Sequence, residues 1–367
     1  MFMSDIKLGK LHYIDAMRGI AILMVVKSHS AMQGVVKMPH GLSVFLSLGT
    51  RGVQLFFIAS AFTLFRSYQN RIIFEKNPIK NFFIRRFFRI APIYYLGILY
   101  YVIRIFFNLP YWLGNQPYIS KSNIMSNVLF FHGFNPYWIN SLVPGGWSIA
   151  VEMLFYALFP FLFTKIKSIH SAFVFLNITL LFKLVFQEYF TYFPFISEPY
   201  LWREFLFYYF PCQLPIFALG VILFFLIEDS SAIKLVSPKV LFLSMILLLL
   251  QVGSTLDFLY FNHIVFGVFF VIFGIVLSKG KLSFICNPIL RYIGKISFSM
   301  YIIHFIVISW LTKFHLIDFC DNYLMNFSIR FSLILSVSVL ISSMSYNLIE
   351  IPFQTIAKKI ISKIDSK

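Results

Sequence analysis

Residues 13–30 read YIDAMRGIAILMVVKSHS, an apolar run of helical length that a few charged and polar residues interrupt. A helix needs about 20 mostly apolar residues to cross the ~30 Å hydrocarbon core of a bilayer. Similar runs fill the chain, since 59% of its 367 residues are hydrophobic and only 12% are charged. A soluble domain carries about 25% charged residues. The sequence therefore predicts an all-α, polytopic integral membrane protein.

About ten membrane-spanning helices are expected, and the segment 122–140 is a candidate re-entrant stretch. No long hydrophilic segment or repeat separates the spans, so residues 1–367 are expected to form one integral-membrane domain with short cytoplasmic tails at 1–11 and 354–367. The first apolar run is charged and lacks a small-residue cleavage site, so no cleaved signal peptide is expected. The expected spans are 12–32, 52–68, 90–108, 146–164, 169–186, 204–227, 238–254, 258–278, 292–312 and 327–349.

The net charge of +17 could indicate nucleic-acid binding, but the placement of the basic residues indicates a membrane topology instead. With the N-terminus in the cytoplasm, most of the 31 Lys and Arg residues fall in inside loops, as the positive-inside rule requires. We therefore predict an N-in, C-in orientation and no nucleic-acid partner. Three scattered cysteines indicate neither a disulfide framework nor a zinc motif. Five tryptophans fall at predicted outer helix ends, as in an aromatic belt: Trp112, Trp138, Trp147, Trp202 and Trp310.

The first predicted span carries two ionisable residues that could act together, Arg18 and His29. Eleven residues at 100° each bring them within about 20° of one face, and a rise of 1.5 Å per residue separates them by ~16 Å. Ionisable residues inside spans usually face the bundle interior and mark function. His29 is a candidate general base near neutral pH or a core histidine bonded to a carbonyl. Arg18 is a site residue or an interfacial anchor, and Asp15 could pair with it.

Two further segments place charged groups near predicted helix ends. Arg85, Arg86 and Arg89 precede the third span, where guanidinium groups could bind phosphate or only anionic lipid. Ser148 and Glu152 lie one turn apart at the start of the span 146–164. They either face a polar cavity or serve as helix-capping groups without a further function.

The predicted span 292–312 carries a polar stripe formed by Ser297, Tyr301 and His304. This spacing of i, i+4 and i+7 places the three side chains on one helix face, which we expect to pack toward the bundle interior or a cavity. Glu350 closes the last span, where we expect an ion pair with a nearby Lys or Arg.

Six short motifs follow one another along the chain. They are Asp15-x-x-Arg18-Gly19 with His29, GVQLFFIASAF (52–62), Arg86-x-x-Arg89, Trp147-Ser148-x-x-x-Glu152, Gly294-x-Ile296-Ser297-Phe298-Ser299-x-Tyr301-x-x-His304 and Glu350-x-Pro352-Phe353.

In this order they resemble the acyltransferase family 3 membrane proteins, which O-acylate bacterial surface glycans. One departure is Ala61, where the family usually has Gly after Ser60, and it puts close helix packing there in doubt. The chain resembles the stand-alone kind, which has no C-terminal esterase-like domain.

The resemblance implies transfer of an acyl group, most often acetyl, from cytoplasmic acyl-CoA to a hydroxyl of a cell-surface polysaccharide or its lipid-linked precursor, such as lipopolysaccharide O-antigen. It implies a bacterial inner-membrane location and no metal. His29 would either deprotonate the acceptor or carry the acyl group. The implied catalytic residues are His29, Arg18 and Glu152. The implied donor-binding residues are Arg85, Arg86, Arg89 and Arg18. The implied acceptor-side residues are Ser60, Trp147, Ser148, Tyr301 and His304.

Two other functions compete with acyl transfer. A transporter or flippase of a lipid-linked sugar would also have many helices with intramembrane polar residues, but it would not need an arginine cluster tied to a histidine. A non-catalytic scaffold would not explain the polar stripe in the span 292–312. We therefore favour acyl transfer, with the lipid bilayer, acyl-CoA and a surface glycan as partners, while the oligomeric state stays open.

Overall fold

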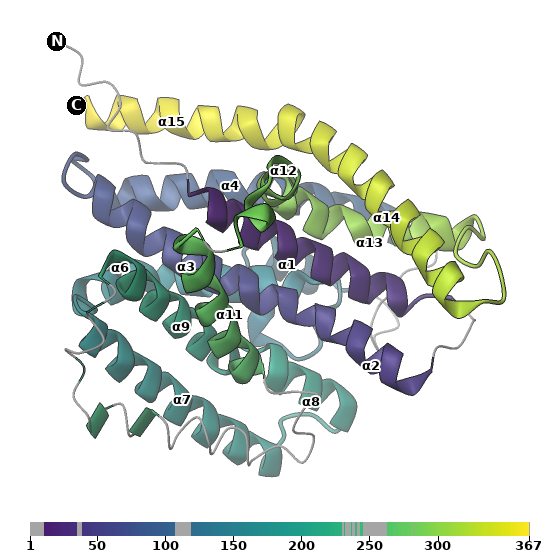
Figure 1. The fold of residues 1–367 in the computed structure, drawn as a ribbon, viewed down its shortest axis with the longest axis horizontal. Helices are drawn as coiled ribbons and strands as arrows, with labels where there is room; N and C mark the ends of the chain where they lie inside the picture. The colour runs from purple at the N-terminus through teal and green to yellow at the C-terminus, as the bar shows by residue number, and fades with distance from the viewer. Residues whose placement is uncertain are drawn as a thin grey trace.

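The computed structural model describes residues 11–34, 39–106, 119–229, 231, 236, 239–240, 243–244, 263–280 and 282–366. Within these ranges every regular element is helical. Figure 1 shows α1 and α3 at the centre, α4 and α15 along one edge and α7 along the opposite edge. The helices are α1 (His12–Ala31), α2 (His40–Ser47), α3 (Gly52–Arg71), α4 (Pro78–Phe106), α5 (Lys121–Val128), α6 (Gly146–Lys165), α7 (Ile169–Tyr192), α8 (Pro199–Tyr208), α9 (Phe210–Glu228), α11 (His263–Ser278), α12 (Pro288–Lys295), α13 (Ser297–Lys313), α14 (Tyr323–Ser345) and α15 (Ile351–Asp365), joined in part by short 3-10 turns and a π-helical turn, Tyr346–Glu350.

The described residues contain six helical segments that are long and apolar enough to cross a membrane, or seven if α12 and α13, bent by 76°, form one span. α11 is a shorter apolar helix, and α1 has 20 residues but carries Asp15, Arg18 and Lys27. The chain is therefore a multi-pass helical membrane protein. The total of ten spans and the N-in, C-in orientation stay predictions, and most of the expected span 238–254 lies outside the described residues.

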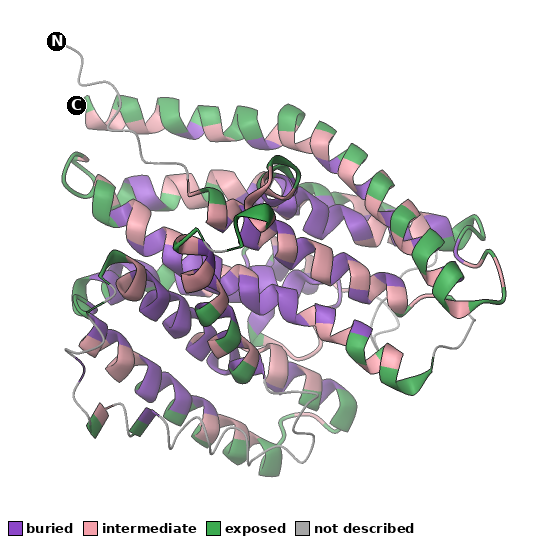
Figure 2. Ribbon diagram, in the orientation of Figure 1, coloured by how far each residue is buried: buried purple, intermediate pink, exposed green. Residues whose placement is uncertain are grey.

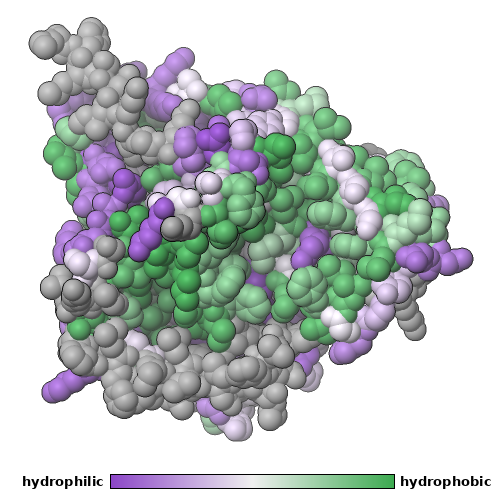
Figure 3. All heavy atoms as spheres, in the orientation of Figure 1, coloured by the Kyte–Doolittle hydropathy of each residue, from purple (hydrophilic) through white to green (hydrophobic). Residues whose placement is uncertain are grey.

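The surface supports the membrane assignment. Large apolar side chains such as Phe161, Ile178, Phe269 and Leu340 are 60% exposed or more, which would be unfavourable for a protein surrounded by water. Figure 3 shows apolar residues over the middle of one face and polar residues gathered mainly toward its two ends. Figure 2 shows the buried residues concentrated at the centre and many exposed residues along the outer helices, among them α14 and α15.

Two motif glycines let α1 and α12 approach closely. A Cβ atom on Gly19 would lie 2.2 Å from the carbonyl oxygen of Leu290, and one on Gly294 would lie 1.8 Å from that of Asp15. Small residues permit this kind of backbone contact between membrane helices. The contact therefore holds α1, with Arg18 and His29, against the segment that leads into α13.

The departure at Ala61 is accommodated by a glycine on the facing helix. A Cβ atom on Gly220 of α9 would lie 2.8 Å from the Ala61 Cβ and 2.6 Å from the carbonyl oxygen of Ile58. α3 and α9 therefore still pack closely, because Gly220 of α9 provides the small residue at this contact.

The candidate re-entrant stretch 122–140 forms α5 and a 3-10 turn. The eight residues of α5 extend only ~12 Å at 1.5 Å per residue, too short to cross a bilayer. Asn127 and His132 are buried, and the Tyr94 hydroxyl of α4 donates to Asn127 Oδ1 at 2.7 Å. This stretch packs against α4, and its re-entry into a membrane stays a prediction.

Candidate active site

A cavity of about 1860 Å³ lies at the end of the bundle where α1 finishes. Its volume exceeds the roughly 300–1,000 Å³ of common small-molecule pockets. His29 from α1, Trp147 at the start of α6 and Tyr301 and Phe305 from α13 line it, together with residues of α3, α4, α7, α8 and α9. The predicted site residues His29, Trp147 and Tyr301 therefore share one cavity.

Two of the five tryptophans expected at outer helix ends, as in an aromatic belt, line this cavity instead. Trp147 and Trp202 are 7% and 5% exposed and line its wall. Their placement in the belt was therefore wrong, because helix ends predict depth in the membrane but not the direction in which a ring points. Trp112 lies outside the described residues.

Several basic side chains of the cavity were not singled out from the sequence. Arg104 and Lys183 are buried in α4 and α7, within the expected spans 90–108 and 169–186. The rule that flagged Arg18, that ionisable residues inside spans mark function, would have found both. The charged residues that line the cavity are Arg51, Arg104, Lys183, Glu188, Arg203, Glu204 and Lys313.

His29 contacts a second histidine, His304. His29 Nδ1 lies 3.0 Å from His304 Nε2, and His304 Nδ1 lies 2.9 Å from the carbonyl oxygen of Met300. His304 is fully buried, whereas His29 is only partly buried. The two histidines come from α1 and α13 and lie 275 residues apart in sequence, so the spacing within either helix could not pair them.

Ser148 and Tyr301 meet at the start of α6. Ser148 Oγ lies 2.9 Å from both the Tyr301 hydroxyl and the carbonyl oxygen of Gly145. Tyr301 also donates to that carbonyl at 3.1 Å. The N-cap residue is Gly145, in the left-handed conformation with φ +78° and with no side-chain capping bond. The capping alternative for Ser148 is therefore wrong, since this hydroxyl instead links α6 to α13 beside the cavity.

Glu152 lies one turn further along α6, in a group of polar side chains. Ser60 Oγ and the Tyr156 hydroxyl donate to Glu152 Oε1 at 2.7 and 2.5 Å. The Arg86 guanidinium lies 5.6 Å from the centre of the Tyr156 ring, and both Arg18 and Arg86 lie within electrostatic range of the carboxylate. Among the predicted residues, this group brings Glu152, Ser60, Arg18 and Arg86 together.

Arg18 is held by α3. Its guanidinium donates to Thr63 Oγ1 at 3.2 Å, and Thr63 donates to the carbonyl oxygen of Ala59 at 2.6 Å. Asp15 is close enough to interact electrostatically, but the described residues contain no Asp15–Arg18 ion pair. Thr63 was not recognised from the sequence, where it is an ordinary polar residue of a span.

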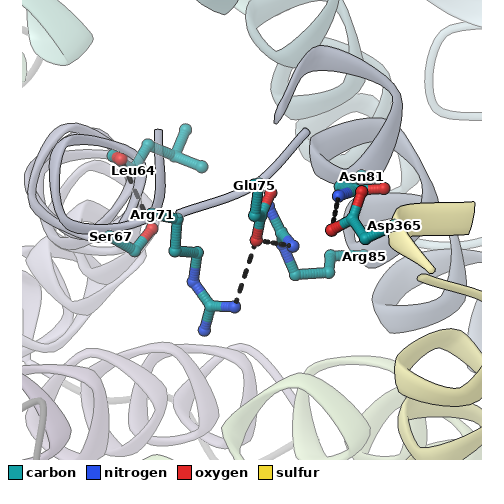
Figure 4. Close-up of polar contacts among 7 residues, drawn as sticks. All are labelled: Leu64, Ser67, Arg71, Glu75, Asn81, Arg85 and Asp365. Atoms are coloured by element: carbon teal, nitrogen blue, oxygen red, sulfur yellow. Dashed lines mark hydrogen bonds and ion pairs between the residues drawn. The ribbon is translucent and has the colours of Figure 1, made fainter. Parts of the chain in front are cut away.

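The three arginines before the third span differ in their partners. Arg85 makes a two-point ion pair with Glu75 at 2.6 and 3.0 Å, and Arg71 lies 3.8 Å from the same carboxylate. Figure 4 shows both arginines reaching Glu75. Arg89 makes no ion pair in the described part of the chain but lies within electrostatic range of Arg18 and Glu350. Arg86 and Arg89 are therefore grouped with Arg18, whereas Arg85 is neutralised by Glu75.

The ion pair expected for Glu350 is not formed among the described residues. Its carboxylate is 4% exposed and accepts a hydrogen bond from Ser299 Oγ at 2.5 Å. The partner of Glu350 is therefore the Ser299 hydroxyl rather than a Lys or Arg side chain. This hydrogen bond links α13 to the turn before α15.

The two groups of site residues occupy different levels of α1. Neither Arg18 nor Glu152 lines the cavity that contains His29. The continuous helix between Arg18 and His29 extends ~16 Å at 1.5 Å per residue. A charged group and a large cavity therefore lie at two levels of one helix, ~16 Å apart.

The fold and these polar groups define a multi-pass helical membrane protein with polar and charged side chains held between its helices. The chain belongs to the acyltransferase domain family, whose model matches residues 11–346, and the resemblance drawn from the motifs is confirmed.

The relatives are bacterial. A Staphylococcus aureus (strain COL) protein named as a candidate O-acetyltransferase is 25% identical over 389 aligned residues, which cover 95% of this chain and 58% of the relative. The relative from strain N315 shows the same values. The peptidoglycan O-acetyltransferase of Listeria monocytogenes is 28% identical over 180 residues, covering 46% of this chain and 26% of that protein. The chain spans 58% of the length of the Staphylococcus relatives. No solved structure matches this protein.

Proposed function

We propose that this protein is a membrane O-acetyltransferase, which moves an acetyl group from cytoplasmic acetyl-CoA to a hydroxyl of a cell-surface glycan or its lipid-linked precursor. The family and the names of the Staphylococcus relatives support acyl transfer to oxygen. The name of the Listeria relative supports a glycan acceptor, since that protein acts on peptidoglycan. Lipopolysaccharide O-antigen is a further acceptor of this class. The protein would act in the bacterial inner membrane.

One observation carries the proposal: α1 connects a group of arginines to a histidine on the wall of a large cavity. The phosphates of acetyl-CoA would bind Arg86 and Arg89, because guanidinium groups suit phosphate. The pantetheine arm would pass Arg18 and bring the thioester toward His29. Arg85 contributes less in this arrangement, since Glu75 already occupies its guanidinium.

The reaction then needs one proton transfer and one acyl transfer. His29 takes the proton of the acceptor hydroxyl as the oxygen attacks the thioester carbon. The carbon–sulfur bond breaks, and the leaving thiolate takes up the proton from His29. The products are the acetyl ester and free coenzyme A. The cavity would hold the acceptor, with Trp147 and Tyr301 against the sugar.

A comparison of surface glycans tests the proposal. Cells that express the protein should carry more acetyl ester on their surface glycans than cells without it, as measured by mass spectrometry of the released glycans. His29→Ala should remove this excess. His12→Ala is the matched control, because His12 is an exposed histidine at the start of the same helix. Wild-type protein that neither binds acetyl-CoA at saturating concentrations nor changes the glycan would refute the proposed function.

A further inference from the structure

We propose that His304 is a positioning residue that determines which nitrogen of His29 reacts. In this arrangement His304 accepts the Nδ1 proton of His29, so that the lone pair of His29 lies on Nε2. The reactivity of His29 rests on the proposed function, whereas the positions of the protons rest only on the hydrogen bonds.

The assignment starts from the carbonyl of Met300. A carbonyl oxygen only accepts hydrogen bonds, so His304 Nδ1, at 2.9 Å from it, must carry a proton. Tautomers are assigned in this way from the hydrogen-bond network.

The second step concerns the charge of His304. Its side chain is fully buried, and in the described part of the chain it contacts His29, Met300, Tyr301 and Phe305 but no carboxylate. A buried cation without a counter-charge costs several kcal/mol, so His304 is neutral. With the proton on Nδ1, its Nε2 can only accept. The donor across the 3.0 Å contact is therefore Nδ1 of His29.

The third step places the remaining nitrogen of His29. Its Nε2 makes no hydrogen bond within the described residues. This nitrogen is not fully buried, so it is open to a hydrogen-bond partner outside the chain. The residue lines the cavity, and the two ring nitrogens point in widely different directions. The lone pair of His29 Nε2 is therefore accessible from the cavity.

This arrangement has a direct use in proton transfer. When Nε2 takes a proton from a hydroxyl, the O–H bond breaks, an N–H bond forms and His29 becomes a cation. The existing bond from its Nδ1–H to His304 then becomes charge-assisted, and such bonds are roughly twice as strong as neutral ones. A base oriented by a third group is the general pattern of activated catalytic sites. Here the third group is the neutral His304 ring, which is itself held by its hydrogen bond to the carbonyl oxygen of Met300.

Nitrogen-15 NMR of histidine-labelled protein in lipid bilayers tests the proton positions without any reaction. The His29 and His304 signals are identified by their loss in His29→Gln and His304→Gln. We expect a protonated Nδ1 and an unprotonated Nε2 in both rings. A protonated Nε2 on His304, or an unprotonated Nδ1 on His29, would overturn the inference.

Two substitutions at His304 then test its role in acetyl transfer. The amide oxygen of His304→Gln can still accept from His29, whereas His304→Leu cannot. We expect His304→Leu to lower kcat by about 100-fold, the lower range for general base catalysis, with KM for acetyl-CoA little changed. His304→Gln should recover most of this loss. Equal losses in both variants would contradict the positioning role.

His132→Gln is the matched control for folding. His132 is also a buried histidine bonded to a backbone carbonyl, with Nε2 3.0 Å from the Gly146 oxygen. This variant should reduce the amount of folded protein without changing the His29 tautomer, and a changed tautomer would count against a specific effect of His304. Wild-type protein with the expected tautomers but without acetyl transfer would refute the proposed function and leave the assignment intact.

Discussion

Replacing Gly145 with alanine should destabilise this protein more than the same change at Gly280. Both glycines have left-handed backbones, with φ +78° and φ +72°. A Cβ atom on Gly145 would lie 2.7 Å from the Tyr301 hydroxyl, whereas one on Gly280 would meet nothing within 4 Å among the described residues. The pair therefore separates backbone strain from the contact with α13.

The expected magnitudes follow from these two terms. A left-handed backbone costs a non-glycine residue roughly 1–2 kcal/mol, which is all that Gly280→Ala should lose. Overpacking typically costs about 1–3 kcal/mol, so Gly145→Ala should lose about 2–5 kcal/mol in total. It should also disturb the Ser148–Tyr301 contact beside the cavity, and with it acetyl transfer.

Thermal denaturation of the purified variants in detergent measures the difference. Gly145→Ala should lower the midpoint clearly more than Gly280→Ala. Tyr301→Phe removes the nearest atom of the contact, so it should cost less in the Gly145→Ala background than in the wild type. Contacting residues usually show such non-additivity.

Equal drops in midpoint for the two alanine variants would show that the contact with Tyr301 costs nothing beyond the backbone strain. Full additivity of Tyr301→Phe and Gly145→Ala would likewise refute the expected clash between the new methyl group and the hydroxyl.

Two further predictions concern the charged group around Arg18. Glu152→Gln should lower acetyl transfer in membrane vesicles by about tenfold or more, because a hydrogen bond to a charged group contributes roughly 1.5–3 kcal/mol; a wild-type rate would exclude this carboxylate from the site. Arg89→Gln should raise the KM for acetyl-CoA more than Arg85→Gln, because Glu75 already pairs with Arg85, and steady-state kinetics with the reverse order would place the donor phosphates on Arg85.

Composition and the placement of charges are enough to predict the class of protein and to single out its ionisable candidate residues. Only 12% of the residues are charged. The free energy of placing a helix in hydrocarbon is to a first approximation a sum over its residue types, so it can be judged without knowing which other helices pack against it. For the same reason Arg18, His29 and Glu152 stood out, since an ionisable group in a span is costly wherever its helix packs.

The partners of these residues follow only from how the helices pack. His29 meets His304, Glu152 accepts from Ser60, and Trp202 lines the cavity although a position in the aromatic belt was expected. Such contacts depend on how each helix is rotated and shifted against its neighbours. Those shifts are set by backbone contacts at small residues from distant segments, such as Gly294 against α1, and the spacing of residues within one helix does not encode them.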